Sequence, residues 1–364
     1  MSTRLSINKL TIIKIVLAVF TFIFVFAVLQ RLFMPKYASY ALEGNLIGEY
    51  YNSTMDQDVV LIGDCEVYAN FSTVSFWENY GITSIIRGSP QQLVWHSYYL
   101  LEDTLRHARK KPQVVVFNVM AMQYSEPARD SEPYNRLNLD GMRLSPVKFR
   151  AFQASHLEDE DFLSYVFPLF RFKENWKELN SEDIRFFLQN PQVSLNGFMV
   201  RSDTQPAGMT PHPILRGNYD FGEKPMYYLE KMTQLAREND IGLILIKAPV
   251  LWPHWFDEWD EQIAQFAAQN DLLYINFYEH VDEIGLDWEK HTFNAGLHLN
   301  AFGAELMAKY LGGVLANEYN IPDRRSDFYI AQHWNEMTQQ YYRLIGIQQE
   351  EISETGKISS FLID

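Results

Sequence analysis

The sequence predicts an α/β protein with an open, mostly parallel sheet of five strands that is covered by helices on both faces. The main evidence is a series of short apolar runs without polar alternation, which is typical of strands buried on both faces. Segments with helical periodicity separate these runs, and such alternation indicates a parallel sheet. The five runs are Val59–Gly63, Ile82–Ile86, Val114–Val119, Leu243–Ile246 and Leu273–Phe277.

Helical periodicity is clearest in three segments, where apolar residues recur every three or four positions and so share one helix face. Ligands of parallel sheets bind beyond the carboxyl ends of the strands. Residues that directly follow the apolar runs are therefore the first candidates for a functional site. The three shared faces are formed by Val94, Tyr98, Leu101 and Leu105, by Tyr228, Met232 and Leu235, and by Met307, Leu311 and Val314.

The N-terminal segment predicts a membrane anchor in residues 1–36. Residues 10–30 are almost wholly apolar, and no charge interrupts residues 15–29. At about 1.5 Å per residue, such a helix crosses the hydrocarbon of a bilayer. A cleaved signal peptide is the competing interpretation, but residues 29–35 offer no cleavage site between small residues. Basic residues flank both ends, and the short N-terminus favours the cytoplasmic side. We therefore expect the residues from about 37 onward to lie outside the cytoplasm.

Composition excludes several classes of function. The 364 residues carry a formal net charge of −15, which argues against general nucleic-acid binding. Cys65 is the only cysteine, so an intrachain disulfide is impossible, and no Cys/His cluster has the spacing of a zinc site. We predict neither a metal nor another cofactor.

The pattern also predicts how the chain is divided. A juxtamembrane segment over residues 37–57 precedes the α/β domain over residues 58–320, and a peripheral helix and tail follow over residues 321–364. Residues from about 121 to 222 break the alternation of strand and helix, and they contain several turn sequences. We interpret them as a helical and loop insertion. This insertion either shapes a substrate pocket or only covers the edge of the sheet.

Cys65 is the first candidate for a reactive group. It follows the first apolar run through Gly63-Asp64 and precedes an amphipathic segment that ends at Tyr80-Gly81. The thiol is thus expected between the carboxyl end of a strand and the N-terminus of a helix, where backbone N–H groups and the helix dipole favour an anion. This environment lowers the pKa of a thiol and makes it a better nucleophile. The alternative is that Cys65 is a small buried hydrophobic residue.

A second motif spans residues 292–304, where a loop with a glycine carries His298 directly into a helical segment. The imidazole can then point from a helix start toward the carboxyl edge of the sheet. A histidine at such a position is also common as a cap or a packing residue. Together, a nucleophile after the first strand and a histidine before the last helix of the domain form an arrangement for acyl transfer, with His298 as general base to Cys65.

In these blocks the sequence resembles the SGNH (GDSL-type) hydrolases, and within them the membrane-anchored envelope branch of DltD-like proteins. The resemblance covers most of residues 58–318. It implies a flavodoxin-like three-layer αβα sandwich and chemistry on an ester or a thioester. It also implies an oxyanion hole made of the N–H groups of Cys65 and Gly88 and the side chain of Asn118. The matching residues are Gly63-Asp64-Cys65, Arg87-Gly88-Ser89, His298-Leu299-Asn300 and Gly303-Ala304.

Two positions depart from the family's pattern. Cys65 stands where the family has serine, and Ala295 stands three residues before His298, where the family has aspartate. Asn294 is one position further back, and we expect it to orient the imidazole as asparagine does in Cys-His-Asn sets. A thiolate paired with imidazolium needs less help from a buried carboxylate than serine does. The same two changes are also expected in a protein that has lost catalysis.

Aromatic residues after the fourth run suggest where a substrate binds. Trp252 and Trp255 open an aromatic and acidic segment that continues to Asp260. We interpret the two tryptophans as a surface that stacks on sugar rings. The alternative is a helix start with acids on its first turn and an aromatic core. Asp64 and Gln91, which lie beyond the first and second runs, complete the predicted substrate-binding residues.

These observations predict an extracytoplasmic acyl esterase or acyltransferase that acts on acyl groups of a cell-envelope polysaccharide or teichoic-acid-like polymer through Cys65 and His298. The expected partners are the lipid bilayer, the polymer or an acyl donor, and a membrane-bound O-acyltransferase. The alternative is a catalytically inactive SGNH-like protein that binds glycan or holds that acyltransferase in place.

Overall fold

The structure is a computed structural model that describes residues 8–34, 46–53, 55–127, 132–158, 160–189, 191–209 and 211–363. The chain divides into two compact units. The first combines the N-terminal segment with residues 161–190, and the second contains residues 45–160 and 191–364.

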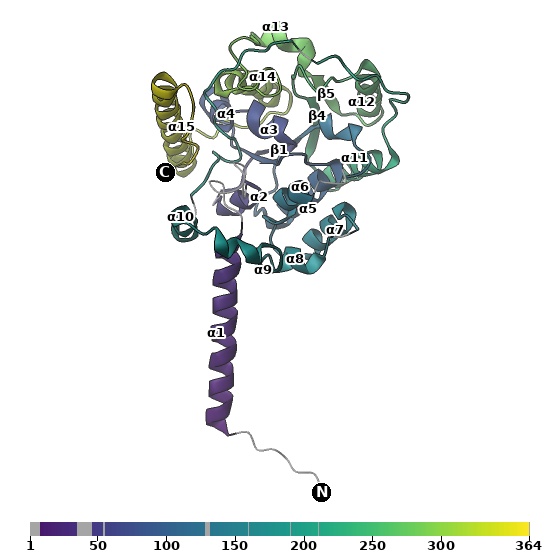
Figure 1. Ribbon diagram of the computed structural model, residues 1–364. Coiled ribbons are helices and arrows are strands. Elements are labelled where there is room, and N and C mark those ends of the chain that lie inside the picture. The colour runs from purple at the N-terminus through teal and green to yellow at the C-terminus, as the bar shows by residue number, and fades with distance from the viewer. Residues whose placement is uncertain are drawn as a thin grey trace. The chain divides into compact units, whose positions relative to one another are not determined.

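Five parallel strands form one sheet in the second unit, in the order β2-β1-β3-β4-β5 (Figure 1). Each predicted apolar run supplies one strand, so the predicted fold class is confirmed. This strand order is that of flavodoxin-like proteins, whose order reverses between β1 and β3. The strands are β1 Val59–Gly63, β2 Ser84–Gly88, β3 Val114–Asn118, β4 Gly242–Lys247 and β5 Leu273–Asn276.

Strand β2 begins and ends two residues later than the apolar run Ile82–Ile86 predicted. It continues through Arg87 to Gly88, which pairs with Gly63 of β1. Arg87 fits inside the fold because its guanidinium forms a fully buried ion pair with Asp103 at 2.9 Å. Because Arg87 is charged, a search for apolar runs ends the strand before it, although its ion pair lets it lie inside the strand.

Helices cover both faces of this sheet. On one face α5, α11 and α12 pack over the side chains of Val60, Ile62, Val115 and Leu245, whereas α3, α4 and α14 pack on the other. The two faces follow from the alternation of side chains along each strand. The helices of these layers are α3 Cys65–Asn70, α4 Thr73–Tyr80, α5 Val94–His107, α11 Glu223–Glu238, α12 Asp257–Gln269 and α14 Ala301–Glu318.

The amphipathic segment after β1 forms two helices rather than one. Helix α3 ends at Asn70, and α4 begins after Ser72, whose Oγ accepts a hydrogen bond from the backbone N–H of Ser75 at 3.1 Å. The backbone N–H of Ser72 donates to the carbonyl of Ala304 in α14 at 3.2 Å. This serine therefore starts a new helix, as N-cap residues do. Gly81 ends α4 in the left-handed region with φ +65°, as the sequence predicted.

Residues 121–222 are helical and irregular, and their parts belong to both units. Helices α6 (Glu132–Leu139) and α7 (Pro146–Ser155) remain with the α/β unit, while residues 161–190 join α1 (Lys9–Phe33) in the first unit. Residues 201–207 return to the α/β unit and run beside the His298 loop. There the N–H of Gln205 donates to the carbonyl of Thr292 at 2.9 Å. The remaining short elements are α2 Leu46–Glu49, η1 Tyr50–Asn52, η2 Val119–Gln123, α6 Glu132–Leu139, α7 Pro146–Ser155, η4 Phe277–His280 and α13 Val281–Ile284.

The C-terminal helix α15, Phe328–Thr355, is longer and more closely packed than expected. The ring of Trp334 is fully buried and stacks on Trp77 of α4, with ring centroids 5.6 Å apart. Near the other end of the helix, Gln348 is also buried and accepts a hydrogen bond from the N–H of Ser202 at 3.0 Å. Residues 321–364 thus include a part of the core of the α/β unit.

In the first unit, α1 spans Lys9–Phe33. Its most apolar window of 18 residues has a mean hydropathy of 2.9, and none of that window is buried. By length and composition this helix can cross a membrane, as an anchor or as a signal sequence. The unit also contains α8 Phe162–Val166, α9 Leu169–Phe172, η3 Lys173–Lys177 and α10 Ser181–Gln189.

Candidate active site

The residues that follow the strands meet at the carboxyl edge of the sheet. Asp64 and Cys65 follow β1, Asn118 ends β3, and Lys247 ends β4. Gly88 ends β2 beside Gly63. This edge is where parallel sheets bind ligands, and the sequence placed its candidates there.

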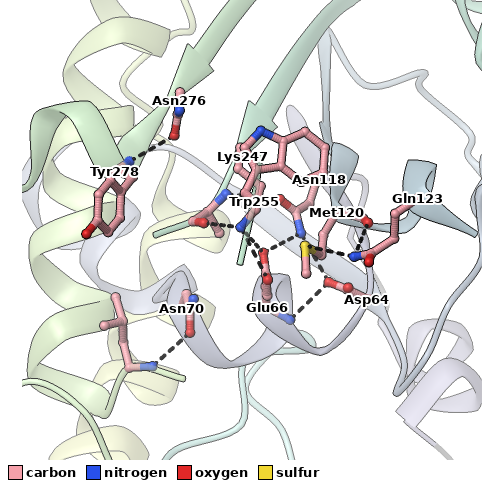
Figure 2. Close-up of polar contacts among 12 residues, drawn as sticks. Asp64, Glu66, Asn70, Asn118, Met120, Gln123, Lys247, Trp255, Asn276 and Tyr278 are labelled. Atoms are coloured by element: carbon pink, nitrogen blue, oxygen red, sulfur yellow. Dashed lines mark hydrogen bonds and ion pairs between the residues drawn. The ribbon is translucent and has the colours of Figure 1, made fainter. Parts of the chain in front are cut away.

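A buried network connects three of these strand ends. The side-chain N–H₂ of Asn118 donates to Asp64 at 3.1 Å and to Glu66 at 2.9 Å. Lys247 forms an ion pair with Glu66 at 3.1 Å and donates to the carbonyl of Ala248 at 2.5 Å. Figure 2 shows Glu66 between Lys247 and Asn118. All four side chains of the network are at most 8% exposed.

This network determines what Asn118 can do. Both hydrogens of its amide are used by the two carboxylates, and its Oδ1 accepts from the N–H of Ala248 at 3.0 Å. In this structure Asn118 therefore holds the strand ends together and leaves no N–H for an oxyanion. The sequence missed Glu66 and Lys247. Lys247 is the one charged residue of an otherwise apolar strand. Its position could have indicated a buried ammonium group, which needs an acidic partner.

Asp64 is an unusual carboxyl group in this network. Burial, and to a lesser extent the negative charge of Glu66, raise its pKa from 3.8 to about 7, although the ammonium of Lys247 opposes both effects. Its Oδ1 also accepts from the N–H of Glu66 at 3.2 Å, which caps helix α3. Asp64 is thus buried among protein groups, and the structure gives it a capping role rather than a surface for substrate.

Two glycines let helix α3 approach the strand ends. A Cβ at Gly63 would lie 2.8 Å from Cβ of Asn118, and a Cβ at Gly88 would lie 2.7 Å from Cγ2 of Val67. The latter would also lie 3.1 Å from the carbonyl oxygen of Asp64. Gly88 therefore lies directly beside the segment that carries Cys65, which suits its predicted place in an oxyanion hole.

Cys65 is the first residue of α3 and is partly exposed. Tyr124, which follows η2, lies within electrostatic reach of it. Burial raises the pKa of Tyr124, and the charges of Asp64 and Cys65 raise it further, while Arg216 lowers it. The sequence did not single out Tyr124 or Arg216, because both lie in the irregular part of residues 121–222.

Asn294 makes two hydrogen bonds with His298, and their geometry fixes the tautomer of the imidazole. Oδ1 of Asn294 accepts from the backbone N–H of His298 at 2.6 Å, so its Nδ2 must be the atom that lies 2.7 Å from Nδ1 of the imidazole. Nδ2 is a donor, and Nδ1 is therefore the acceptor. The proton of the neutral imidazole is then on Nε2.

Nε2 of His298 is buried and has no hydrogen-bond partner among the described residues. Burial and, to a lesser extent, the positive charge of Arg201 lower the pKa of His298 from 6.5 to about 4, so the ring is neutral at pH 7. The N–H of the next residue, Leu299, donates to Asn70 at 2.9 Å. Asn70 is at the opposite end of α3 from Cys65, about 7.5 Å along the helix axis. The structure thus places His298 near the helix of Cys65 without a hydrogen bond from its Nε2 to the thiol.

The predicted substrate-binding tryptophans have different surroundings. Nε1 of Trp252 donates to the carbonyl of Ala295 at 3.2 Å, so this residue supports the His298 loop. Trp255 lines a cavity of about 500 Å³ beyond β4 and β5. Gln91 is exposed in a turn with φ +49°. The cavity is lined by Lys247, Ala248, Val250, Leu251, His254, Trp255, Asp257, Asp260, Glu261, Asn276, Tyr278 and Glu279.

Asp260, which also lines this cavity, accepts hydrogen bonds from three neighbouring side chains. Its Oδ1 accepts from Tyr274 at 2.5 Å, from Asn276 at 3.0 Å and from Trp255 at 3.1 Å. In Figure 2, Trp255 lies over Lys247, with the ammonium 5.8 Å from the ring centroid. Within the described part of the chain, no group of three or more His, Cys, Asp or Glu residues is arranged to hold a metal ion.

The strand order and the residues at the carboxyl edge define the class of the protein as flavodoxin-like α/β. No protein-family model and no curated protein matches the chain. Among solved structures, it is similar to a protein from Desulfitobacterium hafniense DCB-2 that is assigned to the lipolytic G-D-S-L family, with 14% identity, a TM-score of 0.37 and coverage of 71% of this chain and 100% of that one.

It is also similar to a protein from Bacteroides fragilis NCTC 9343 that is assigned as an acylhydrolase. The identity is 12%, the TM-score is 0.33, and the match covers 80% of this chain and 95% of that one. At these values the similarities carry no argument about activity, which must come from the site.

Proposed function

We propose that this protein is an SGNH-like acyl esterase or acyltransferase. Cys65 is its nucleophile, and the imidazole of His298 assists as a hydrogen-bond donor. The observation that carries the proposal is the state of His298. One ring nitrogen is oriented by a neighbouring side chain, and the other is buried without a partner near the helix of the single cysteine. Buried polar atoms normally have a partner, and exceptions require an explanation. A substrate that enters between His298 and Cys65 supplies one.

In the proposed reaction the Cys65 thiolate attacks the acyl carbonyl carbon of a donor. A C–S bond forms, and the charge on the carbonyl oxygen is stabilised by the N–H groups of Cys65 and Gly88. The bond to the leaving group then breaks, and Cys65 carries the acyl group as a thioester. Water or a hydroxyl of the polymer then attacks the carbonyl carbon of this thioester, the C–S bond breaks, and the Cys65 thiolate is restored. The proton that the water or hydroxyl loses passes to solvent, where it neutralises the thiolate released from the donor.

The tautomer of His298 favours thioester donors. With its proton on Nε2 and a pKa of about 4, the neutral ring can donate a hydrogen bond but has no acidic proton for an alkoxide. A thiolate leaving group departs without such help, because a thiol has a pKa of about 8.5. Catalytic hydrogen bonds are often long without substrate, so we expect His298 to approach Cys65 when the donor is bound.

We place this reaction outside the cytoplasm, on acyl groups of a cell-envelope polysaccharide or teichoic-acid-like polymer, with a membrane-bound O-acyltransferase as a partner. The support is the apolar helix α1 together with the residues that resemble the DltD-like branch. The cavity around Trp255 offers an aromatic ring and several carboxylates. Such a surface suits the hydroxyl groups of a sugar better than a phosphate.

An acyl thioester probe tests this proposal. The full-length protein in detergent is incubated with the probe, and intact mass is measured with peptide mapping. We expect one acyl adduct on Cys65, none on the Cys65→Ala variant, and slower release from the adduct in His298→Ala. Turnover of the probe that persists in Cys65→Ala would contradict the proposal.

The second candidate is a catalytically inactive protein that binds glycan or holds the acyltransferase in place. It is favoured by the asparagine at position 294, whose Nδ2 keeps Nδ1 of His298 without a proton, so the imidazole is in the wrong tautomer for a general base. If Cys65→Ala and His298→Ala both keep normal polymer acylation in cells while Trp255→Ala abolishes it, this second candidate is the correct one.

A further inference from the structure

Residues 161–189 form a collar on the C-terminal end of α1, and they consist of α8, α9, η3 and α10. The ring of Phe26 in α1 contacts Phe167 and Phe170, with ring centroids 5.6 and 6.4 Å away. The side chain of Asn175 donates to the carbonyl of Phe33 at 2.8 Å. Figure 1 shows α9 and α10 beside this end of α1. The collar therefore packs against α1 through specific aromatic and hydrogen-bond contacts.

The collar exposes large apolar side chains from every one of its elements. On α10, Ile184 and Leu188 are one turn apart on the exposed face, while Phe186 is buried. A single groove for a peptide would concentrate apolar groups on one element, but here they are spread over all four. The exposed residues are Leu163 at 51%, Phe167 at 36%, Phe170 at 54%, Trp176 at 59%, Ile184 at 53% and Leu188 at 72%.

The depth of these contacts along α1 identifies the environment. The apolar part of α1 ends where Gln30 and Arg31 begin its polar end. Phe26 is four residues earlier, or about 6 Å along the helix axis. Helices that lie in a membrane interface bury their apolar face about 5–10 Å into the boundary of head groups and acyl chains. Phe167 and Phe170 are at this depth if α1 spans the bilayer.

We propose that the collar is an interfacial membrane-binding surface that inserts Phe170, Trp176, Ile184 and Leu188 into the outer lipid leaflet around α1. The proposal rests on the anchor role that we assign to α1. The exposed apolar surface of the collar continues the apolar surface of α1, so we expect the same lipids to cover both. Tryptophan is typical of such interfaces. In this proposal the first unit contacts the membrane through both the helix and the collar.

The charges of the collar predict how it binds. Positive and negative residues nearly balance, so anionic lipids gain no net attraction from it. We therefore expect insertion to depend on apolar area, and to be the same in neutral and anionic bilayers and at high salt. Its basic residues are Arg171, Lys173, Lys177 and Arg185, and its acidic residues are Asp161, Glu174, Glu178, Glu182 and Asp183.

The test uses full-length protein in phosphatidylcholine vesicles. In a Cys65→Ser background, single cysteines are introduced by Phe170→Cys or Leu188→Cys and labelled with an environment-sensitive fluorophore. Phe20→Cys on α1 reports the anchor, and Glu354→Cys at the exposed end of α15 is the matched control. Lipids with quenchers at a shallow or a deep acyl position then measure the depth of each label.

We expect Phe170→Cys and Leu188→Cys to be quenched at least about twofold by the shallow lipid, Phe20→Cys by the deep lipid, and Glu354→Cys by neither. If Phe20→Cys is quenched while the two collar labels stay solvent-exposed, the collar proposal is wrong and the anchor stands. If the collar labels are shielded but not quenched, protein covers this face, and the proposal is equally wrong. If no label is quenched, the anchor itself fails.

Discussion

Asn294 is the residue on which the chemistry of the site depends most directly. Its Oδ1 is committed to the backbone N–H of His298, so its Nδ2 keeps Nδ1 of the imidazole without a proton. An amide in place of a triad carboxylate stabilises the wrong tautomer for a general base. In a serine protease this change lowers kcat about 10⁴-fold. The asparagine therefore limits His298 to donating a hydrogen bond.

Asn294→Asp should reverse this limitation. One carboxylate oxygen keeps the hydrogen bond from the backbone N–H, and the other accepts a hydrogen bond from Nδ1–H. The ring proton is then on Nδ1, so Nε2 is free to act as a base. We expect the rate of ester hydrolysis to rise at least about tenfold, with a smaller change for thioesters. Steady-state kinetics with an ester and a thioester of the same acyl group measure both. Asn320→Asp, the same change at an exposed position, should leave both rates unchanged. Equal rates in Asn294→Asp and the parent would disprove the tautomer argument.

Two buried groups of the site should make stability depend on pH in opposite directions. The pKa of Asp64 is raised from 3.8 to about 7 in the folded state, so the folded protein binds a proton that the unfolded chain has lost, and Asp64 reduces stability as pH rises from about 4 to 7. The pKa of His298 is lowered from 6.5 to about 4, so the unfolded chain binds the extra proton, and stability rises between pH 4 and 6.5.

Single substitutions should separate these two effects. Compared with Asp64→Asn, which keeps a capping side chain, the parent should become progressively less stable as pH rises from 4 to 7. Compared with His298→Gln, it should become more stable from pH 4 to 6.5. Urea unfolding of the full chain in detergent measures both differences. A difference from Asp64→Asn that is constant over this range would show that Asp64 titrates normally.

At the scale of elements, α15 should stabilise the α/β unit through its contact with α4. Trp334→Ala removes a fully buried ring from its stack on Trp77, and such a truncation costs about 3–5 kcal/mol. Phe328→Ala on the same helix removes a ring that is 73% exposed and should cost less than about 0.5 kcal/mol. The melting temperatures of the two variants compare them. A similar loss in both would mean that α15 contributes little through this contact.

The elements also show where pattern reasoning succeeds. Strand β1 has the predicted bounds because all five of its residues are buried and apolar. Strand β2 shifted by two residues because Arg87 is paired inside the fold, and the segment after β1 divided because Ser72 can cap a new helix. The partner of Arg87 lies 16 residues away in another element, which no local pattern reveals, whereas the cap of Ser72 on Ser75 is local.

At the scale of the molecule, the two units divide the work that we propose. The α/β unit carries the candidate site at the carboxyl edge of its sheet, and the first unit combines a helix that is long and apolar enough to cross a membrane with an apolar collar. Residues 161–190, which the sequence assigned to an insertion over the sheet, are grouped with α1 instead. Their aromatic residues were visible in the sequence, but their association with a helix more than 120 residues earlier was not.

The sequence by itself determined the sheet, the apolar helix and the position of the candidate residues, because apolar periodicity and strand-end position are local properties. It also identified the pair of Asn294 and His298, which are four residues apart in one loop. Only the tertiary structure decided the tautomer of His298, the commitment of Asn118 to Asp64 and Glu66, and the ion pair of Glu66 with Lys247. These depend on hydrogen bonds between groups brought together by the fold, in an interior where a donor or a charge without a partner is costly.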